Sequence, residues 1–331
     1  MSKFLLMLVS ILVSFAVVIG CSAKTEEATT TEPAKTEEVT KDTVETKTTE
    51  VRVVEHAMGK TEIAGSPQKV VVLYNGMVDI SLALGVTPVG AVESWLEKPF
   101  YNYLKDQMVG VMNLGEEGQP NLEAIATLQP DLIIGSVLRD EKIYEQLSKI
   151  APTVFSESVF DWKENMTLAA KALGKEDADI AFKQEWDNKV ADIQAQMGDK
   201  LKDTEVSIVR FDPDHSRIYY TGFAGTILAE VGFSRPENQR VDEWGVKLTT
   251  KESIPEMNGD VIFDITSDWL GDGAVYKTKE DWTSHALWKN LDAVKNDQVF
   301  EVDAITWNMS GGATAAMMML DDLYTIFNLK K

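Results

Sequence analysis

The chain contains little cysteine and little histidine. Its one cysteine, Cys21, lies near the start of its 331 residues, and its three histidines, His56, His215 and His285, are far apart in the sequence. These shortages exclude a disulfide framework, a thiolate metal site and cysteine catalysis from the rest of the chain. We therefore expect no metal held directly by protein side chains and no resident cofactor.

Basic charge is also scarce. The chain has 53 acidic residues against 32 lysines and arginines, which gives a formal net charge of −21 at pH 7. A face that binds nucleic acid or an anionic membrane surface needs a basic excess, so we expect no nucleic-acid partner. An anionic ligand would have to be held by a local cluster of basic side chains.

Common catalytic motifs are missing as well. The sequence contains no Gly-x-Ser-x-Gly elbow, no His-Glu-x-x-His and no phosphate-binding Gly-rich loop ahead of a helix. The sequence thus favours binding over catalysis, and no residue is assigned a catalytic role. An anchored extracellular hydrolase remains an open alternative.

The N-terminus has the pattern of an export signal. A lone lysine precedes an apolar run over residues 4–20, and Cys21 follows directly after the small Gly20. This pattern resembles the lipobox of bacterial lipoproteins, so we expect a signal peptide at 1–20 and a lipidated Cys21 as the mature N-terminus. An uncleaved anchor helix is the alternative. Both interpretations place the rest of the chain outside the cytoplasm, attached to the cell membrane.

Residues 21–50 are predicted to form a disordered acidic tether. After the cysteine they are mostly Thr, Glu, Lys, Ala and Val, with no aromatic side chain. Such a composition cannot bury a core.

Residues 51–331 alternate strand-like apolar runs with helical patterns, which favours an α/β fold. About 280 residues exceed one ordinary core, so we expect two lobes, at 51–160 and 199–331. We predict strands at residues 70–73, 89–92, 132–135, 153–155, 206–211, 261–265 and 299–302. We predict helices near residues 77–84, 122–128, 142–150, 226–231, 284–291 and 312–327.

The segment at 161–198 is predicted to connect the lobes. A helical pattern covers residues 162–197 and is interrupted near Gly174. The expected fold is two similar, Rossmann-like α/β lobes joined by a single long interlobe helix, with a ligand cleft between the lobes.

A short internal repeat supports two related lobes. Glu123 lies eight residues before Asp131, which opens an apolar run, and Glu252 lies eight residues before Asp260, which opens another. We interpret this as a trace of duplication.

Several stretches, taken in order, resemble a known family. They are His56-Ala57-Met58-Gly59-Lys60-Thr61-Glu62-Ile63, Gln129-Pro130-Asp131-Leu132-Ile133, Tyr144-Glu145-Gln146-Leu147-Ser148-Lys149-Ile150-Ala151-Pro152-Thr153-Val154, and Trp307 with Gly311-Gly312. From about Val53 to its end the chain resembles the iron-siderophore and cobalamin class of substrate-binding proteins of ABC importers. The resemblance implies a monomer that binds a ferric siderophore between its lobes and passes it to an ABC permease with a cytoplasmic ATPase.

Arginines near predicted strand ends are candidate ligand contacts. Arg139 follows one apolar run, Arg210 lies at the end of another, and Arg217 precedes a third. A guanidinium can make forked, charge-assisted contacts to carboxylate or hydroxamate oxygens. The alternative is a surface arginine paired with a neighbouring acid, such as Asp140 or Asp212.

Aromatic side chains at strand exits are the second group of candidates, because flat rings can cover the partly apolar faces of a chelate. They are Tyr74, Trp95, Trp269 and Trp307. We assign Trp162, Trp186, Trp244, Trp282 and Trp288 to packing.

Glu123 and Glu252 have a different expected role. In the family that the chain resembles, one acid on each lobe docks onto arginines of the permease, and these two residues occupy matching places. A carboxylate at a helix start also caps the helix, which would need no partner.

The sequence therefore predicts capture of a ferric siderophore, of citrate or hydroxamate type rather than catecholate, with iron present only as the chelate. Cobalamin or haem binding in the same fold is the alternative, with Met77 or Tyr74 as a possible axial ligand for haem. A sensor domain or adhesin would leave the paired glutamates without a partner.

Overall fold

The computed structural model describes residues 51–331, which belong to one compact unit. The predicted signal peptide, Cys21 and the tether lie outside the described residues. Within residues 51–331, no helix combines the length and the apolar character that a membrane span requires.

The first lobe is built on a five-stranded parallel sheet, with strand order β5-β4-β3-β6-β7. Its strands are β3 (Val70–Val72), β4 (Gly90–Ala91), β5 (Met112–Asn113), β6 (Leu132–Ser136) and β7 (Thr153–Ser156). The helical segments are α1 (Asn75–Ala83), α2 (Leu122–Leu128), α3 (Val137–Asp140), η1 (Glu141–Ile143) and α4 (Tyr144–Ser148). A hairpin of β1 (Val51–His56) and β2 (Gly59–Ala64) packs beside β7. The central strands are buried along their whole length, as expected for a parallel sheet covered on both faces.

The second lobe has a mixed sheet, with strand order β10-β9-β8-β11-β12. Its strands are β8 (Val206–Asp212), β9 (His215–Tyr219), β10 (Gly245–Leu248), β11 (Val261–Asp264) and β12 (Val299–Glu301). Its helical segments are α7 (Lys200–Asp203), α8 (Gly222–Val231), η2 (Glu237–Gln239), η3 (Lys251–Met257), α9 (Ala274–Thr283), α10 (Ala286–Lys289), α11 (Asp292–Lys295), η4 (Ile305–Met309, a π-helical turn) and α12 (Ala313–Ile326). Strands β9 and β10 run antiparallel to their neighbours, and the sequence did not predict this pair as two strands.

The internal repeat marks the same place in both lobes. The Asp131 carboxylate accepts hydrogen bonds from the backbone N–H groups of Gln68 and Lys69, just before β3. The Asp260 carboxylate accepts one from the backbone N–H of Glu205, just before β8. Each aspartate thus fixes the start of the neighbouring central strand, so the parallel trio β3-β6-β7 corresponds to β8-β11-β12.

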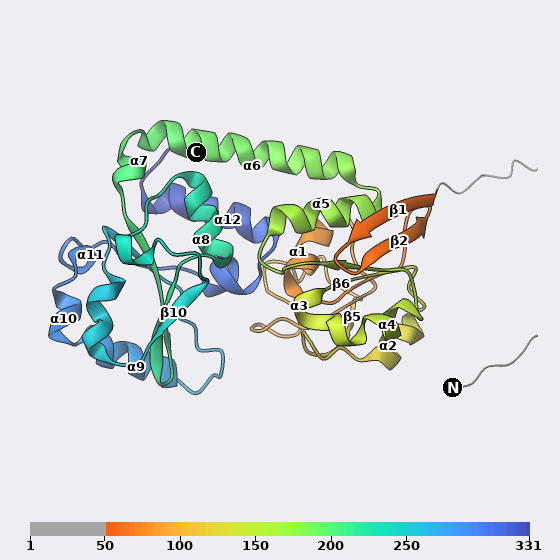
Figure 1. Cartoon of the computed structure of the whole chain (residues 1–331), viewed down its shortest axis with the longest axis horizontal. Helices are drawn as coiled ribbons and strands as arrows, with labels where there is room; N and C mark the ends of the chain where they lie inside the picture. The colour runs from red at the N-terminus through yellow and green to blue at the C-terminus, as the bar shows by residue number, and fades with distance from the viewer. Residues whose placement is uncertain (1–50) are drawn as a thin grey trace, which may run out of the picture. The chain divides into compact units, whose positions relative to one another are not determined.

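The predicted connecting helix is in fact two helices. Helix α5 (Trp162–Leu173) ends at Gly174, which adopts the left-handed conformation, and α6 (Glu176–Met197) begins directly after it. The two helices fold back on each other, since the rings of Trp162 and Trp186 lie 4.9 Å apart. Helix α6 alone extends from one lobe to the other (Figure 1). The prediction of one helix over 161–198 is therefore corrected, because the glycine reverses the chain instead of merely kinking it.

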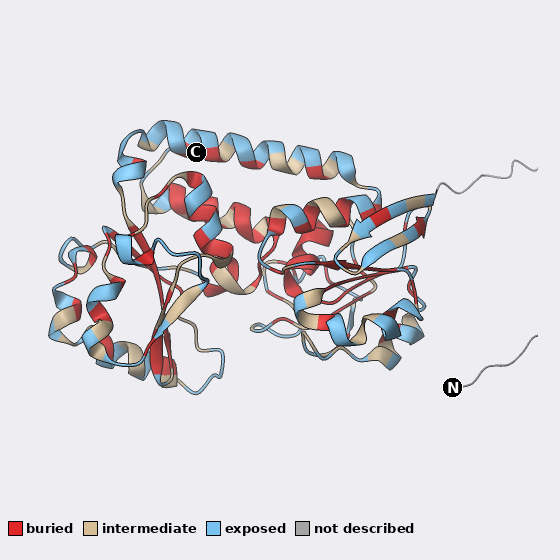
Figure 2. Ribbon diagram, in the orientation of Figure 1, coloured by how far each residue is buried: buried red, intermediate tan, exposed pale blue. Residues whose placement is uncertain are grey.

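The lobes also share a hydrophobic core. Helix α12, which comes from the second half of the sequence, packs on α1 of the first lobe as well as on α5, α6 and α8. One cluster of buried residues includes Tyr74 and Ile134 from the first lobe together with Ile208 and Phe263 from the second. Figure 2 shows mostly buried segments beneath α6, between the two sheets. The lobes are therefore joined by packing as well as by α6.

Candidate ligand-binding cleft

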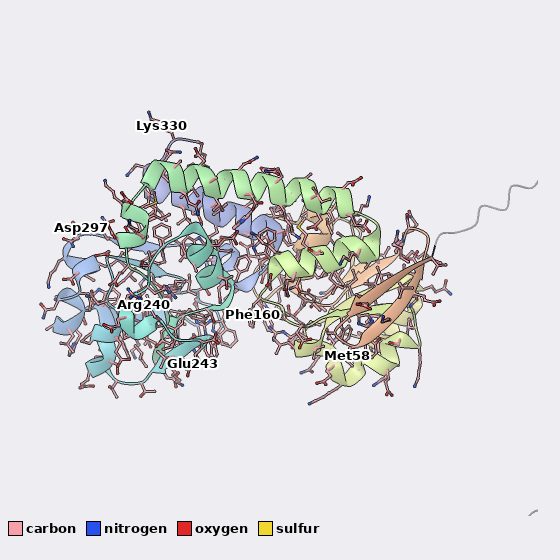
Figure 3. The ribbon with its side chains drawn as sticks, turned by 45° about the horizontal axis from the view of Figure 1, so that its top comes forward. Met58, Phe160, Arg240, Glu243, Asp297 and Lys330 are labelled. Carbon is pink, nitrogen blue, oxygen red and sulfur yellow. The ribbon has the colours of Figure 1, made fainter. Side chains whose placement is uncertain are left out.

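A cleft of about 810 Å³ lies between the two lobes. Segments that follow strands β3, β4 and β6 line it on one side, and β8, β9 and the chain after β9 line it on the other. Lining residues include Tyr74, Trp95, Glu117, Arg139, Phe160, Arg210, Tyr219, Trp244, Trp269 and the segment 308–311. Phe160 lies where the two lobes meet (Figure 3). Open α/β sheets commonly bind ligands at such positions.

Arg139 lies on the wall formed by the first lobe. It is held by Glu117, whose Oε1 lies 2.6 Å from the arginine Nε. The buried Glu117 carboxylate also accepts hydrogen bonds from the backbone N–H and side-chain amide of Asn75, at the first turn of α1. Among residues 51–331, no hydrogen bond uses either terminal nitrogen of Arg139. That edge of the guanidinium is therefore available to an acceptor in the cleft.

Arg210 lies on the opposite wall, in β8. Its Nη2 lies 2.9 Å from Asp212 Oδ1, and its guanidinium lies 5.6 Å from the centre of the Tyr219 ring. The Nε of Arg210 is buried and has no hydrogen-bond partner within the described residues. Each lobe thus contributes one arginine to the cleft, and each arginine is oriented by a buried carboxylate.

Arg217 lies beside Arg210 on this wall but is not among the residues that line the cleft. Its Nε donates to Asp212 Oδ2 at 3.1 Å, and its guanidinium lies 5.1 Å from the centre of the Trp244 ring. Arg210 and Arg217 are partners in the β8–β9 register, so they share one face of the sheet. The structure places Arg217 as a support for Asp212 and Trp244 rather than as a lining residue.

Exposed aromatic rings surround the cleft. Trp95, Trp244 and Trp269 are 44%, 52% and 49% exposed, which is unusual for tryptophan and leaves part of each ring accessible from the cleft. Tyr74 differs, because its ring is buried and its hydroxyl accepts a hydrogen bond from the Ser156 hydroxyl at 3.0 Å. Burial raises the pKa of Tyr74. It therefore contributes a neutral floor to the cleft.

Trp307 does not line the cleft, contrary to the expectation from the sequence. It is fully buried, its ring packs on Phe263, and its Nε1 donates to Asp322 Oδ2 at 2.8 Å. The π-helical turn η4 directs Trp307 into the core, while the next residues, 308–311, face the cleft. Trp307 is therefore a core residue.

Trp244 is the opposite case, since a packing role was predicted for it from the sequence. It precedes β10 and lies against Tyr219, with ring centres 5.7 Å apart. Arg217 and Tyr219 lie two residues apart in β9, so their side chains point to the same face of the sheet. This spacing is the sequence signal that could have located the sheet face against which Trp244 packs. Trp162, Trp186, Trp282 and Trp288 are buried, as predicted.

A buried acid lies under the first-lobe wall. Burial raises the pKa of Asp140 to about 7, and the nearby negative charge of Glu117 adds to this, whereas the Ser136 N–H and Arg139 act in the opposite direction. One oxygen of Asp140 and the hydroxyl of Ser136 have no hydrogen-bond partner within residues 51–331. The protonation of Asp140 is thus coupled to the charge pair that faces the cleft.

The two candidate docking residues are exposed, one on each lobe. Glu123 lies in the first turn of α2, but the Asn121 side chain caps that helix by accepting from the N–H groups of Glu123 and Ala124. Glu252 lies in the first turn of η3, where its own backbone N–H and the Thr250 hydroxyl lower its pKa. The cap of α2 therefore does not depend on the Glu123 carboxylate.

Residues 51–331 contain no group of three histidine, cysteine, aspartate or glutamate side chains that could hold a metal ion. The cleft is lined by guanidinium groups, aromatic rings, hydroxyls and the carboxylates of Glu117 and Asp161.

Two α/β lobes joined by a helix, with arginines and aromatic rings lining the cleft between them, define a solute-binding protein. The chain belongs to the periplasmic binding protein family, whose profile matches residues 70–306. Members of this family are binding proteins.

Individual relatives cover most of the chain. The probable siderophore-binding lipoprotein YfiY of Bacillus subtilis (strain 168) is 47% identical over 294 residues, which is 86% of this chain and 90% of that protein. The achromobactin-binding periplasmic protein of Dickeya dadantii (strain 3937) is 36% identical, over 80% of this chain and 89% of that protein. The crystal structure of Staphylococcus aureus SirA complexed with staphyloferrin B matches with a TM-score of 0.80 and 47% identity, over 84% of this chain and 99% of that one.

Proposed function

We propose that this protein captures a ferric siderophore outside the cytoplasm and delivers it to an ABC importer. The observation that best supports this is the cleft itself, with Arg139 and Arg210 on opposite walls among exposed tryptophans. The relatives named for siderophore binding support the same ligand class. The iron is cargo, enclosed in its chelator, so the protein needs neither a cofactor nor a catalytic residue.

The charges of the cleft favour a citrate-type or hydroxamate chelate. The guanidinium edges can pair with carboxylate or hydroxamate oxygens. The tryptophans would then cover the apolar edges of the chelate.

The remaining parts of the proposal concern attachment and delivery. A lipidated Cys21 and the acidic tether would hold a monomer at the outer face of the membrane. Glu123 and Glu252, exposed on separate lobes, would orient it on the permease.

Haem binding of the kind considered from the sequence is disfavoured. Met77 is fully buried and does not line the cleft, and the Tyr74 hydroxyl is already hydrogen-bonded to Ser156. Neither side chain presents a free axial ligand to the cleft.

The test is tryptophan fluorescence, titrated with ferric citrate, a ferric hydroxamate, a ferric catecholate, cobalamin and haemin, each against its metal-free form. We expect saturable quenching by ferric citrate or the hydroxamate. Trp244→Phe and Trp269→Phe should reduce the quenching, whereas Trp282→Phe, which alters a buried ring outside the cleft, should not. A chain that responds to no ferric chelate would refute the proposal.

A further inference from the structure

The start of helix α12 is docked on α1 of the first lobe at very short range. A Cβ atom added to Gly312 would lie 2.3 Å from the Cβ of Asp79, and one added to Gly76 would lie 2.8 Å from the backbone oxygen of Gly311. Real Cβ atoms do not approach other atoms this closely. The contact therefore requires glycine at position 76 in α1 and at position 312, directly before α12.

Asp79 occupies the centre of this contact. Its side chain is fully buried in α1, and its two oxygens accept hydrogen bonds from the backbone N–H groups of Thr314 and Ala315, at 2.7 and 3.0 Å. These N–H groups belong to the first turn of α12, which has no side-chain cap from its own N-cap residue. A carboxylate at this position satisfies two orphan donors and complements the helix dipole.

A second set of contacts connects Asp79 to the cleft. The Tyr103 hydroxyl donates to Asp79 Oδ2 at 2.7 Å and also lies 2.5 Å from the Ser310 hydroxyl. Ser310 belongs to the segment 308–311, which lines the cleft just before α12 begins. Asp79 therefore holds both the helix and the stretch of cleft wall that leads into it.

This arrangement differs from the two aspartates that start the central strands. Asp131 and Asp260 accept backbone hydrogen bonds from residues just before strands of their own lobe. Asp79 accepts them from a helix more than 230 positions later in the chain, so its bonds connect the two halves. Loss of these bonds would weaken the contact between α1 of the first lobe and the start of α12.

We propose that Asp79 is a positioning residue that fixes the spacing of the two lobes, and with it the width of the cleft, by anchoring α12 and residues 308–311 on α1. The consequence for ligand binding rests on the proposed function, but the consequence for lobe spacing does not. With Asp79 intact, the cleft is held at one width before any ligand arrives, so little ordering is left for the binding step.

The first experiment measures lobe spacing without ligand. Spin labels at Lys149→Cys and Lys289→Cys, exposed positions in different lobes, are placed in the full chain with Cys21→Ser so that no other thiol takes the label. We expect Asp79→Asn to broaden and shift the distribution of distances between the two spin labels, as measured by pulsed electron paramagnetic resonance. Asp131→Asn, which also replaces a carboxylate that accepts two backbone N–H bonds, should leave it unchanged.

Gly312→Ala provides an independent variant, because it removes no hydrogen-bonding group but forces α12 away from Asp79. It should change the distribution in the same way. Unchanged distributions in both variants, with native circular dichroism, would overturn the proposal. If Asp79→Asn does not fold, Gly312→Ala and Tyr103→Phe decide the question.

The second experiment measures kinetics with the ferric chelate that quenches the wild-type protein. We expect Asp79→Asn to release it about tenfold faster, with a smaller change in the association rate. Release at the wild-type rate would contradict the link to binding. If the wild-type chain binds none of the probes, the proposed ligand class fails, while the distance measurement still decides the role of Asp79.

Discussion

At the scale of single residues, Arg139 and Glu117 form a charge pair on the cleft wall. Arg139→Ala removes the guanidinium and leaves the buried Glu117 carboxylate facing an anionic ligand. We expect the affinity for the quenching ferric chelate to fall about 10- to 100-fold, since a hydrogen bond to a charged group contributes roughly 1.5–3 kcal/mol. Fluorescence titration measures this.

Two further variants separate charge from contact. Arg139→Ala with Glu117→Gln should recover part of the lost affinity, because the unpaired negative charge is gone. Arg240→Ala removes an exposed arginine that pairs with Glu205 outside the cleft, and it should bind like the wild type. Wild-type affinity in Arg139→Ala would show that this residue does not contact the ligand.

The raised pKa of Asp140 predicts a pH dependence of stability. The folded chain holds this proton up to about pH 7, whereas an unfolded aspartate loses it near pH 3.9. The stability associated with this group is therefore fully present below about pH 4 and falls as pH rises to about 7, by up to about 1.4 kcal/mol per pH unit.

Asp140→Asn should remove this slope. Urea unfolding of both proteins at about pH 4.5 and about pH 7.5 gives the comparison. We expect the wild type to lose roughly 2–4 kcal/mol relative to the variant between these values. Parallel pH profiles would show that Asp140 titrates normally.

Side chains at strand exits were predictable from the sequence, and those on the sheet face were not. Arg139, Tyr74, Trp95 and Trp269 follow strands, and the structure places all of them around the cleft. Trp244 lies at the cleft because β10 pairs with β9, and β9 with β8, in antiparallel register. Its position could be predicted only by someone who already knew this pairing. Trp307 follows a strand too, but the π-helical turn rotates it into the core.

At the scale of elements, Gly174 reverses the chain between α5 and α6. It adopts φ +67°, and a Cβ there would lie 2.6 Å from Nη1 of Arg52, whose other terminal nitrogen, Nη2, donates to the backbone oxygen of Gly65. Gly174→Ala should therefore lower the free energy of unfolding by about 1–2 kcal/mol for the backbone alone, and by more once Arg52 is displaced. Chemical denaturation measures the loss.

Gly85→Ala is the matched control. Gly85 follows α1 at φ +74°, and a Cβ there meets no atom within 4 Å. It should show the backbone cost without the collision. Equal losses in the two variants would mean that Arg52 moves aside freely.

The same glycine explains one limit of prediction. The strands predicted at residues 70–73, 132–135 and 261–265 are present in the structure, because a run of apolar and β-branched residues favours a strand without reference to the rest of the chain. Whether Gly174 kinks a helix or reverses it depends on the packing of Trp162 against Trp186, which no local pattern reports.

At the scale of the whole molecule, the exposed glutamates separate capture from delivery. Glu123→Lys and Glu252→Lys lie outside the cleft, so each should leave chelate affinity unchanged. In cells that rely on this protein for iron, we expect either reversal to reduce uptake of the ferric chelate, and both together to abolish it. Glu145→Lys reverses another exposed acid and should transport normally. Normal uptake by the double variant would favour a role other than delivery.

The hydrophobic cluster that extends from Tyr74 and Ile134 to Ile208 and Phe263 has a further thermodynamic consequence. If one lobe unfolded, the apolar side chains that the other lobe contributes to this cluster would become exposed to water. The two lobes should therefore unfold together, in a single calorimetric transition whose van't Hoff and calorimetric enthalpies agree. A chelate that touches only the cleft would then protect the most distant strand edges against proteolysis as strongly as the cleft itself.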